Sequence, residues 1–239
     1  MFLHLTALTT HKCEAGNAMI TCPYTKSSIV GYAQSGLKSG STMVTAQFSP
    51  ITGESIALED LTPVGDGVED AVVVQTLDAF GYTVDSYEWN SWAQDTTCWV
   101  DGNLDKAEGV SFTQGQGLWV QGSAAGQGLQ SAGKVGTADL LVQLRSGSIG
   151  VGNPFPITVD LNDIIPEGEG VEDAVVIQTL DAFGYTVDSY EWNSWAQDTT
   201  CWVDGNLDKA EGVSFAPGQG LWVQGASTAQ YLRFPAPEL

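Results

Sequence analysis

Oxygen-bearing side chains at alternate positions form the best candidate for a metal site in this sequence. Asp101, Asn103 and Asp105 alternate with other residues, and Glu108 follows closely. A Ca²⁺-binding loop supplies its ligands in this way, although an EF-hand also needs Gly at its sixth position and Glu at its twelfth. This chain has Lys and Phe there. The alternatives are therefore a smaller Ca²⁺ site, with no other cofactor expected, and a solvated acidic turn. The same pattern recurs at Asp204, Asn206, Asp208 and Glu211.

Large aromatic side chains precede this acidic stretch and could stack on sugar rings. On a strand, Tyr87 and Trp89 would share one face and Trp92 would point to the other, because side chains alternate. Trp99 and Trp119 lie inside apolar strands and are predicted to be core residues. For the first three, the alternatives are a glycan-binding or partner-binding surface and ordinary packing in a core or protein interface. Their counterparts later in the chain are Tyr190, Trp192 and Trp195.

No constellation for catalysis stands out in the sequence. The two histidines, His4 and His11, lie outside the repeated segments described below, so no repeat can hold a Ser-His-Asp set. Acids are so abundant that any pair chosen for glycoside hydrolysis is uninformative. The glycine-rich GQGLWVQG lacks the Lys-Ser/Thr of a phosphate-binding loop, and its glycines are typical of hairpin turns. We therefore expect a protein that is not an enzyme.

The acids and aromatics belong to a segment that occurs twice. Residues 67–122 recur as residues 170–225. A weaker likeness extends upstream, because LKSGS at 37–41 corresponds to LRSGS at 144–148. A fixed period of this length usually marks a duplicated structural unit. The two near-identical segments differ at three positions: Val74 is Ile177, Thr113 is Ala216 and Gln114 is Pro217.

The duplication predicts the domain organisation. An N-terminal strand segment is expected at 1–30, a first β domain at 31–125 and a second at 133–239 with a C-terminal strand. The glycine- and serine-containing stretch 123–132 is the best candidate for a linker.

Short strands are the dominant pattern within the repeated segment. DAVVVQTLD, YTVDSYEWNSWA, TTCWV, GVSF and LWVQG are rich in β-forming residues and are separated by turn residues. A change of phase near Asp85–Ser86 predicts a β-bulge. Closely spaced short strands are typical of antiparallel sandwiches and barrels. The predicted fold class is therefore all-β, with two tandem antiparallel sandwich-like or barrel-like domains and an extra N-terminal strand segment.

The net charge is strongly negative. The chain has 29 Asp and Glu against 8 Lys and Arg, which gives −21 at neutral pH. Such a surface repels phosphate backbones and anionic membranes, so neither nucleic-acid binding nor membrane insertion is expected. It keeps the exterior soluble and attracts divalent cations or basic partners.

The cysteines do not have the spacing of a zinc site. Cys98 and Cys201 occupy the same position in the two copies. Cys13 and Cys22 could form a disulfide, but pairing cannot be deduced from sequence, and four free or buried thiols are the alternative.

The start of the chain bears on location. Its apolar run is short and no basic residues precede it, so no signal peptide is predicted. No stretch is long enough for a transmembrane helix. Either a leader has been removed or the protein leaves its cell by another route, as a virion component would.

Several motifs extend over most of residues 27–239. They are SSIVGYAQSGLKSGSTMV, SGSIGVGNPFPITVDLNDI, GQGLWVQG in each copy and the closing RFPAPEL. As a set they resemble a poorly characterised family of secreted or surface bacterial tandem-repeat β proteins. Members of that family carry a signal peptide directly before the SSIVGY-like start, whereas this chain has a longer N-terminal segment. The resemblance implies a repeat architecture and an extracellular or cell-surface location, with no established activity.

Taken together, these patterns favour a non-enzymatic structural or assembly protein exposed on a cell surface, a filament or a virion. The expected partner is the chain itself, and the N-terminal segment could add to a sheet edge of a neighbouring subunit. The alternative is a glycan-binding module whose two copies give avidity. That alternative predicts exposed Trp89 and Trp192. A hydrolase is least favoured, because two intact active sites in so short a chain would be unusual.

Overall fold

The computed structural model describes residues 30–48 and 55–237, so the expected N-terminal strand segment lies outside the described residues apart from Val30. The predicted all-β class is confirmed, with 48% strand and 3% helix in small antiparallel sheets. Within the described residues, no helix is both long and apolar enough to cross a lipid bilayer.

The first half of the chain forms three sheets of its own. Their strand orders are β1-β10-β4, β2-β9-β5-β6-β7 and β3-β8. The strands are β1 (Val30–Gly36), β2 (Gly40–Thr45), β3 (Ile56–Ala57), β4 (Thr62–Val64), β5 (Val73–Leu77), β6 (Thr83–Asn90), β7 (Cys98–Val100), β8 (Ser111–Phe112), β9 (Gly117–Gly122) and β10 (Gly128–Lys134), with a short 3₁₀ turn η1 (Leu58–Asp60) after β3.

The second half repeats this arrangement. Its sheets have the orders β11-β20-β14, β12-β19-β15-β16-β17 and β13-β18. The strands are β11 (Leu140–Gln143), β12 (Gly147–Gly152), β13 (Val159–Asp160), β14 (Ile165–Glu167), β15 (Val176–Leu180), β16 (Thr186–Asn193), β17 (Cys201–Val203), β18 (Ser214–Phe215), β19 (Gly220–Gly225) and β20 (Tyr231–Phe234), with η2 (Leu161–Asp163) after β13.

The end of the first half differs from the expected linker. Residues 128–134 form strand β10, which pairs with β1 from Val30↔Lys134 to Gly36↔Gly128. Part of the stretch 123–132 therefore belongs to a sheet. Its glycines and serines suggest a flexible linker, but pairing with β1 and β4 satisfies its backbone groups.

Each half has a hydrophobic core of its own, anchored by a buried tryptophan. In the first half, Trp99 donates its indole N–H to the carbonyl of Leu61 at 2.8 Å. In the second half, Trp202 donates to Ile164 at the same distance. A buried indole needs such a partner, and here the carbonyl that follows each 3₁₀ turn supplies it.

The predicted bulge is present one residue earlier than expected. On the β5–β6 ladder, Thr76 faces Asp85 and Leu77 faces Thr83, which leaves Val84 as the extra residue. The same irregularity recurs between β15 and β16.

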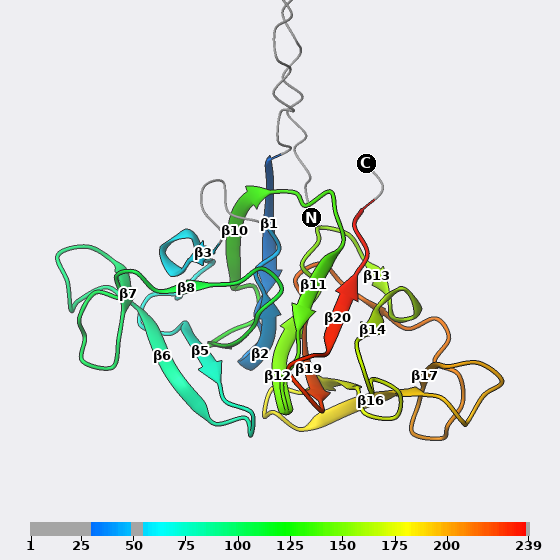
Figure 1. The fold of residues 1–239 in the computed structure, drawn as a ribbon. Coiled ribbons are helices and arrows are strands. Elements are labelled where there is room, and N and C mark those ends of the chain that lie inside the picture. Colours follow the sequence, from blue (N-terminus) through cyan, green and yellow to red (C-terminus); the bar gives the residue numbers. More distant parts are fainter. Residues whose placement is uncertain (1–29, 49–54, 238–239) are drawn as a thin grey trace, which may run out of the picture.

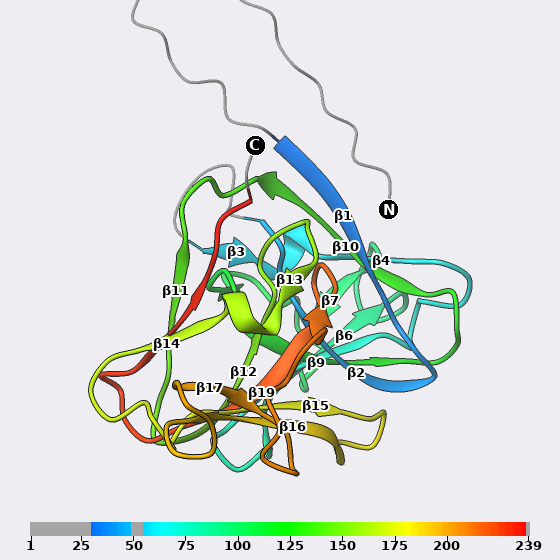
Figure 2. The same ribbon diagram turned by 90° about the vertical axis from the view of Figure 1, so that its right-hand side faces the viewer.

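The expectation of separate sandwiches is wrong. The small antiparallel sheets have a four-bladed, propeller-like arrangement, and Figures 1 and 2 show the ribbon from two sides. Strands β2 and β9 pack against β12 and β19 of the other half. The two halves also share backbone hydrogen bonds, from Thr45 to Gly218 at 3.0 Å and from Gly152 to Gly115 at 3.1 Å.

Glycines at this junction are the physical reason for the difference. A side-chain carbon added at Gly117 would lie 2.6 Å from the backbone of Gly150. A sandwich needs side chains on both inner faces to fill a gap of about 10 Å. Here the contacting faces carry glycine, so the backbones of the two halves meet directly.

One ion-pair cluster closes the second half. Arg233 of β20 bonds Glu167 through Nε at 2.6 Å and Asp139 through Nη1 at 3.0 Å. Asp139 also accepts the backbone N–H of Ala236 at 2.8 Å. The N–H of Ala236, followed by the guanidinium of Arg233, lowers the pKa of Asp139 below its ordinary value of 3.8. The cluster therefore ties β20 to both strands beside it.

This lowered pKa predicts how Asp139 contributes to stability at different pH. Its ionised form should stabilise the folded protein above pH 3.8, and the contribution should be lost as pH falls through the lower folded pKa. The difference in free energy of unfolding between wild type and Asp139→Asn should therefore shrink on acidification, measured by urea unfolding at several pH values. Asp95→Asn is the control, since the exposed Asp95 makes no hydrogen bond or ion pair within the described residues. An unchanged difference for Asp139→Asn would contradict the prediction.

Candidate functional site

Two hairpins expose an unusual number of large apolar side chains. On the hairpin formed by β5 and β6, Phe80 is 83% exposed, Tyr82 is 72% and Val84 is 62%. The hairpin between β15 and β16 repeats the set with equal exposure, at Phe183, Tyr185 and Val187. We call these two groups of three side chains the hairpin tips. Large exposed apolar side chains that lie close together in this way commonly mark an interaction site.

Local hydrogen bonds hold each tip in one conformation. In the first tip, the carboxylate of Asp78 accepts the backbone N–H of Phe80 at 2.8 Å and that of Tyr82 at 2.9 Å. The backbone N–H of Asp78 in turn donates to the carbonyl of Tyr82 at 2.9 Å. Gly81 takes a positive φ of 86°, which favours glycine at this position of the turn. Asp181 plays the same role in the second tip.

Each tip is anchored to the opposite half of the molecule. Ser148 donates its backbone N–H to Ala79 at 3.2 Å, and Ser41 donates to Ala182 at 3.2 Å. Every such contact occurs twice with the halves exchanged, as a two-fold arrangement requires. The tips therefore hold a fixed position relative to both halves.

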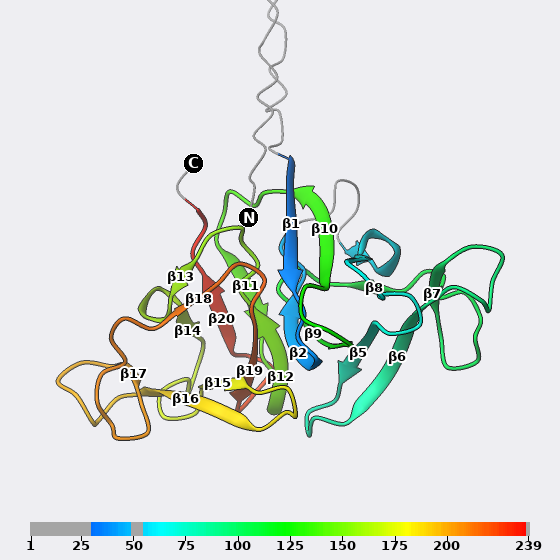
Figure 3. The same ribbon diagram turned by 180° about the vertical axis from the view of Figure 1, so that it is seen from behind.

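The tips lie at one end of the molecule. In Figures 1 and 3, the β5–β6 and β15–β16 turns lie near each other at the bottom, while β1 begins and β20 ends toward the top. The contacts of Ala79 beside Gly147 and of Ala182 beside Gly40 agree with this placement, because β12 and β2 begin there. The molecule thus presents both tips on the same end face.

Comparison with family models, curated proteins and solved structures gave no match to this chain. The resemblance to secreted bacterial repeat proteins therefore remains an expectation.

The aromatic residues proposed as a binding platform are divided by the fold. Tyr87 and Trp89 are half-buried and pack against the core, where Trp89 meets Trp99 edge-on with ring centres 5.3 Å apart. Trp92 is 65% exposed on the loop after β6, at the end of the strand away from the tip. The structure therefore does not gather Tyr87, Trp89 and Trp92 into one open surface.

The second copy is arranged in the same way. Tyr190 and Trp192 pack on the core, and Trp195 is exposed like Trp92. Burial, followed by the charges of Asp188 and Asp204, raises the pKa of the Tyr190 hydroxyl. This hydroxyl therefore stays protonated to higher pH than an ordinary tyrosine.

The two tryptophans predicted to be core differ from each other. Trp99 is buried as expected. Trp119 is only half-buried, and its ring lies beside Gly184 in the hairpin of the other half. The apolar run LWV predicts burial of Trp119 within its own half, and it does not predict this contact with the other half.

The residues of the proposed Ca²⁺ site form a self-contained turn. The carboxylate of Asp101 accepts the backbone N–H groups of Asn103 at 2.8 Å and Asp105 at 3.1 Å. Glu108 pairs with Lys106 at 3.2 Å. Asp204, Asn206, Asp208 and Glu211 repeat this pattern, with a Lys209–Glu211 pair at 3.5 Å. Across residues 30–48 and 55–237, no three acidic, His or Cys side chains are grouped as metal ligands.

The sequence contains a signal for the hairpin tips that the motifs considered above do not include. Tyr82 and Val84 alternate with polar residues, and a Phe stands beside them in the turn. This alternation predicts a strand with one apolar face, and such a face is normally assigned to the core. Only the fold shows that this apolar face points to solvent.

Proposed function

We propose that this chain is a non-enzymatic structural protein that associates with a second copy of itself through the hairpin tips. The observation that carries the proposal is the exposure of four aromatic rings and two valines at one end of the molecule, on hairpins whose backbones are hydrogen-bonded locally and to the opposite half. An aromatic side chain can bury about 150–250 Å². Four of them approach the roughly 800 Å² that each partner contributes to a standard protein interface. The surface therefore has the size suited to a protein partner.

Symmetry favours an identical partner. The internal repeat relates the two tips by a two-fold rotation. The same end face of a second copy can therefore pack against them, and symmetry makes each contact occur more than once. Such a contact is closed and yields a dimer. Growth into a filament needs a second contact, and the edge strands β1 and β11 offer unpaired backbone for an added strand. This arrangement fits the extracellular or surface location that the motifs imply.

Charge predicts the salt dependence of this association. Two copies of net charge −21 repel each other, and dissolved salt screens that repulsion. The apolar contact itself is insensitive to screening of this kind. Association should therefore strengthen as NaCl is raised from about 10 mM to about 500 mM, where the Debye length falls several-fold.

The double variant Phe80→Ser/Phe183→Ser tests the proposal. Sedimentation of wild type should show a dimer that becomes more populated with concentration and salt, whereas the variant should stay monomeric. The matched control is Trp92→Ser/Trp195→Ser, which removes rings of 65% and 66% exposure away from the tips. It should associate like wild type. A wild type that stays monomeric at high salt, or equal association of both variants, would refute the proposal.

A second candidate function is glycan binding at Trp92 and Trp195. One observation favours it: both rings are open to solvent. The loops that carry them begin at Asn90 and Asn193, whose side-chain oxygens accept the backbone N–H of Trp92 and of Trp195, each at 3.0 Å. Exposed rings of this kind can stack on sugars. The control variant above separates the two candidates, since it would abolish glycan binding and leave association intact.

A further inference from the structure

Two clefts that the internal repeat relates to each other lie at the junction between the halves. The larger, the Arg145 cleft, has a volume of about 540 Å³ and the smaller, the Lys38 cleft, about 380 Å³. Both fall in the range of small-molecule sites. Met43, Leu77, Gln116, Val142, Arg145 and Trp222 are among the residues that line the first cleft. The second is lined by, among others, Ser35, Lys38, Met43, Leu180 and Gln219.

The internal repeat relates these clefts position by position. Lys38 and Arg145 occupy the same place in LKSGS and LRSGS. Leu180 and Gln219 are likewise the repeats of Leu77 and Gln116. Each cleft therefore combines a basic residue that precedes β2 or β12 with residues from the near-identical segment of the opposite half.

The charge of the clefts is opposite to that of the rest of the molecule. None of the described residues that line either cleft is Asp or Glu, although the chain has 29 of them. The basic residues Lys106, Lys209 and Arg233 form ion pairs. Arg145 and Lys38 form none with the described residues. A cation without a counter-charge in an otherwise acidic protein is suited to an anionic ligand.

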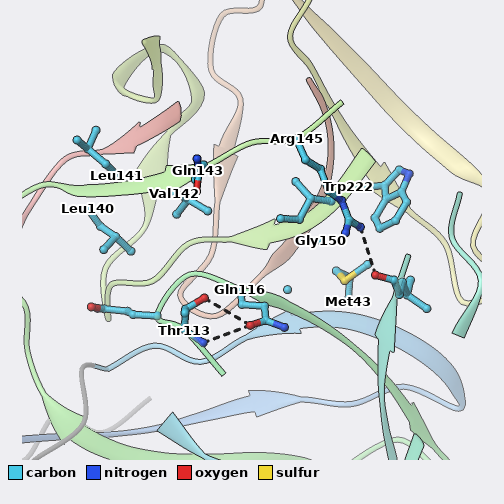
Figure 4. Close-up of a pocket in the computed structure, with 14 residues that line it drawn as sticks. Met43, Thr113, Gln116, Leu140, Leu141, Val142, Gln143, Arg145, Gly150 and Trp222 are labelled. Carbon is cyan, nitrogen blue, oxygen red and sulfur yellow. Dashed lines mark hydrogen bonds between the residues drawn. The ribbon is translucent and has the colours of Figure 1, made fainter. Parts of the chain in front are cut away.

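Arg145 is held in place before any ligand arrives. Its Nε donates to the carbonyl of Ser148 at 2.8 Å, and its Nη2 donates to Leu77 of the other half at 3.3 Å. Nη1 keeps both of its N–H groups without a partner in the described part of the chain. Figure 4 shows the guanidinium beside Trp222 and Met43 at one side of the cavity. A guanidinium fixed in this way loses little side-chain entropy on binding a carboxylate.

Gln116 offers a second fixed donor in the same cavity. Its side-chain oxygen accepts the backbone N–H of Thr113 at 3.2 Å and the hydroxyl at 3.4 Å. This fixes the amide so that its nitrogen points away from Thr113 (Figure 4). Leu77, Val142 and Trp222 supply apolar surface around these donors.

The few differences between the near-identical segments fall at these clefts. Of three differing positions, two line them: Thr113 and Gln114 in the Arg145 cleft are Ala216 and Pro217 in the Lys38 cleft. The hydroxyl of Thr113 is thus absent from the second cleft. The two clefts therefore have equivalent residues at most of the positions compared, but the side chains at 113 and 114 are polar and those at 216 and 217 are apolar.

We propose that the Arg145 cleft binds a small organic anion that carries one carboxylate and an apolar body. The carboxylate meets Arg145 Nη1, and the body lies against Trp222 and the neighbouring aliphatic side chains. Such a carboxylate could belong to a free acid or to the C-terminal end of a peptide.

Ligand-observed NMR titration with 4-phenylbutyrate tests this proposal, with the neutral 4-phenyl-1-butanol as the matched probe. Arg145→Gln should raise the Kd for 4-phenylbutyrate at least about tenfold, which corresponds to about 1.4 kcal/mol, and should leave the Kd of the alcohol unchanged. Arg145→Lys keeps the charge and should lose less affinity. Lys38→Gln, at the equivalent position of the other cleft, should change the Kd less than about twofold.

Two further measurements complete the experiment. Circular dichroism tests whether each variant is folded. If Arg145→Gln is unfolded, the test relies on the Kd values of 4-phenylbutyrate and 4-phenyl-1-butanol for wild type and Arg145→Lys. An acetyl-Gly-Phe-Leu peptide with a free carboxylate, compared with its amide, distinguishes the sources: tighter binding than 4-phenylbutyrate indicates a peptide end, and weaker binding a free acid. The proposal would be overturned if neither 4-phenylbutyrate nor the free-carboxylate peptide bound at about 10 mM, because a built site binds small ligands more tightly than that. Equal affinity for 4-phenylbutyrate and 4-phenyl-1-butanol would also overturn it.

Discussion

Replacing Trp202 by alanine is expected to lower the free energy of unfolding by about 3–5 kcal/mol, the range for a large aromatic removed from a core. The side chain is fully buried and belongs to the second core. It also meets Trp192 edge-on, with ring centres 5.3 Å apart. The variant loses the burial and this ring contact together, and leaves a cavity.

The hydrogen bond from the indole adds a separable part of this effect. Trp202→Phe keeps an aromatic ring but leaves the carbonyl of Ile164 without its donor, which costs about 1–3 kcal/mol in a buried setting. Trp202→Phe should therefore be less destabilised than Trp202→Ala and more than wild type. Urea unfolding followed by circular dichroism measures all three.

An exposed tryptophan of the same half is the control. Trp195→Ala removes a ring that is 66% exposed and should change the free energy of unfolding by no more than about 0.5 kcal/mol. Similar losses for Trp202→Ala and Trp195→Ala would mean that the core is not where the structure places it.

Gly117→Ala is expected to destabilise the protein by about 3 kcal/mol, the upper end for overpacking. The added methyl carbon would lie 2.6–2.8 Å from the backbone of Gly150 and Val151. Backbone cannot move aside by a change of rotamer, so the halves must separate locally. The hydrogen bonds between Gly152 and Gly115 and between Thr45 and Gly218 lie beside this contact and would weaken with it.

Gly102→Ala is the matched control for this prediction. Gly102 has no atom within 4 Å of an added side-chain carbon and does not take a positive φ. Such a change is normally neutral or stabilising by about 0.4–1 kcal/mol, because it restricts the unfolded chain. Urea unfolding compares the two variants. Equal stability of both would show that the halves do not meet at Gly117.

The two predictions concern different levels of the structure. Trp202 tests the core within one half, and Gly117 tests the junction between halves. The distinction matters for function, because each hairpin tip is hydrogen-bonded to the opposite half and the Arg145 cleft is lined by residues of both halves. A protein whose halves separated would retain its cores and lose these surfaces.

Local patterns were sufficient to predict the strands. The five predicted strands of the repeat correspond to β5, β6, β7, β8 and β9. Alternation of apolar and polar residues and the intervening turn residues depend on neighbours in sequence, so they can be read without a structure. The bulge was foreseen to within a residue for the same reason.

The candidate site was predicted less well, because exposure depends on distant contacts. Trp89, Trp92 and Trp99 lie within eleven residues of one another, yet one is half-buried, one exposed and one buried. The Asp101 turn matched the start of a metal loop, but its carboxylate bonds its own backbone. Neither outcome can be derived from residue type and spacing alone.

The sequence by itself determined that the chain is all-β, duplicated and strongly acidic, because composition, repeats and strand periodicity are properties of the linear chain. The tertiary structure decided that the sheets form a propeller-like arrangement and that the hairpin tips face solvent. It also decided that Lys38 and Arg145 form no ion pair with the described residues. The physical reason is that these features rest on contacts such as Gly117 with Gly150, where residues distant in sequence meet only after both halves have folded.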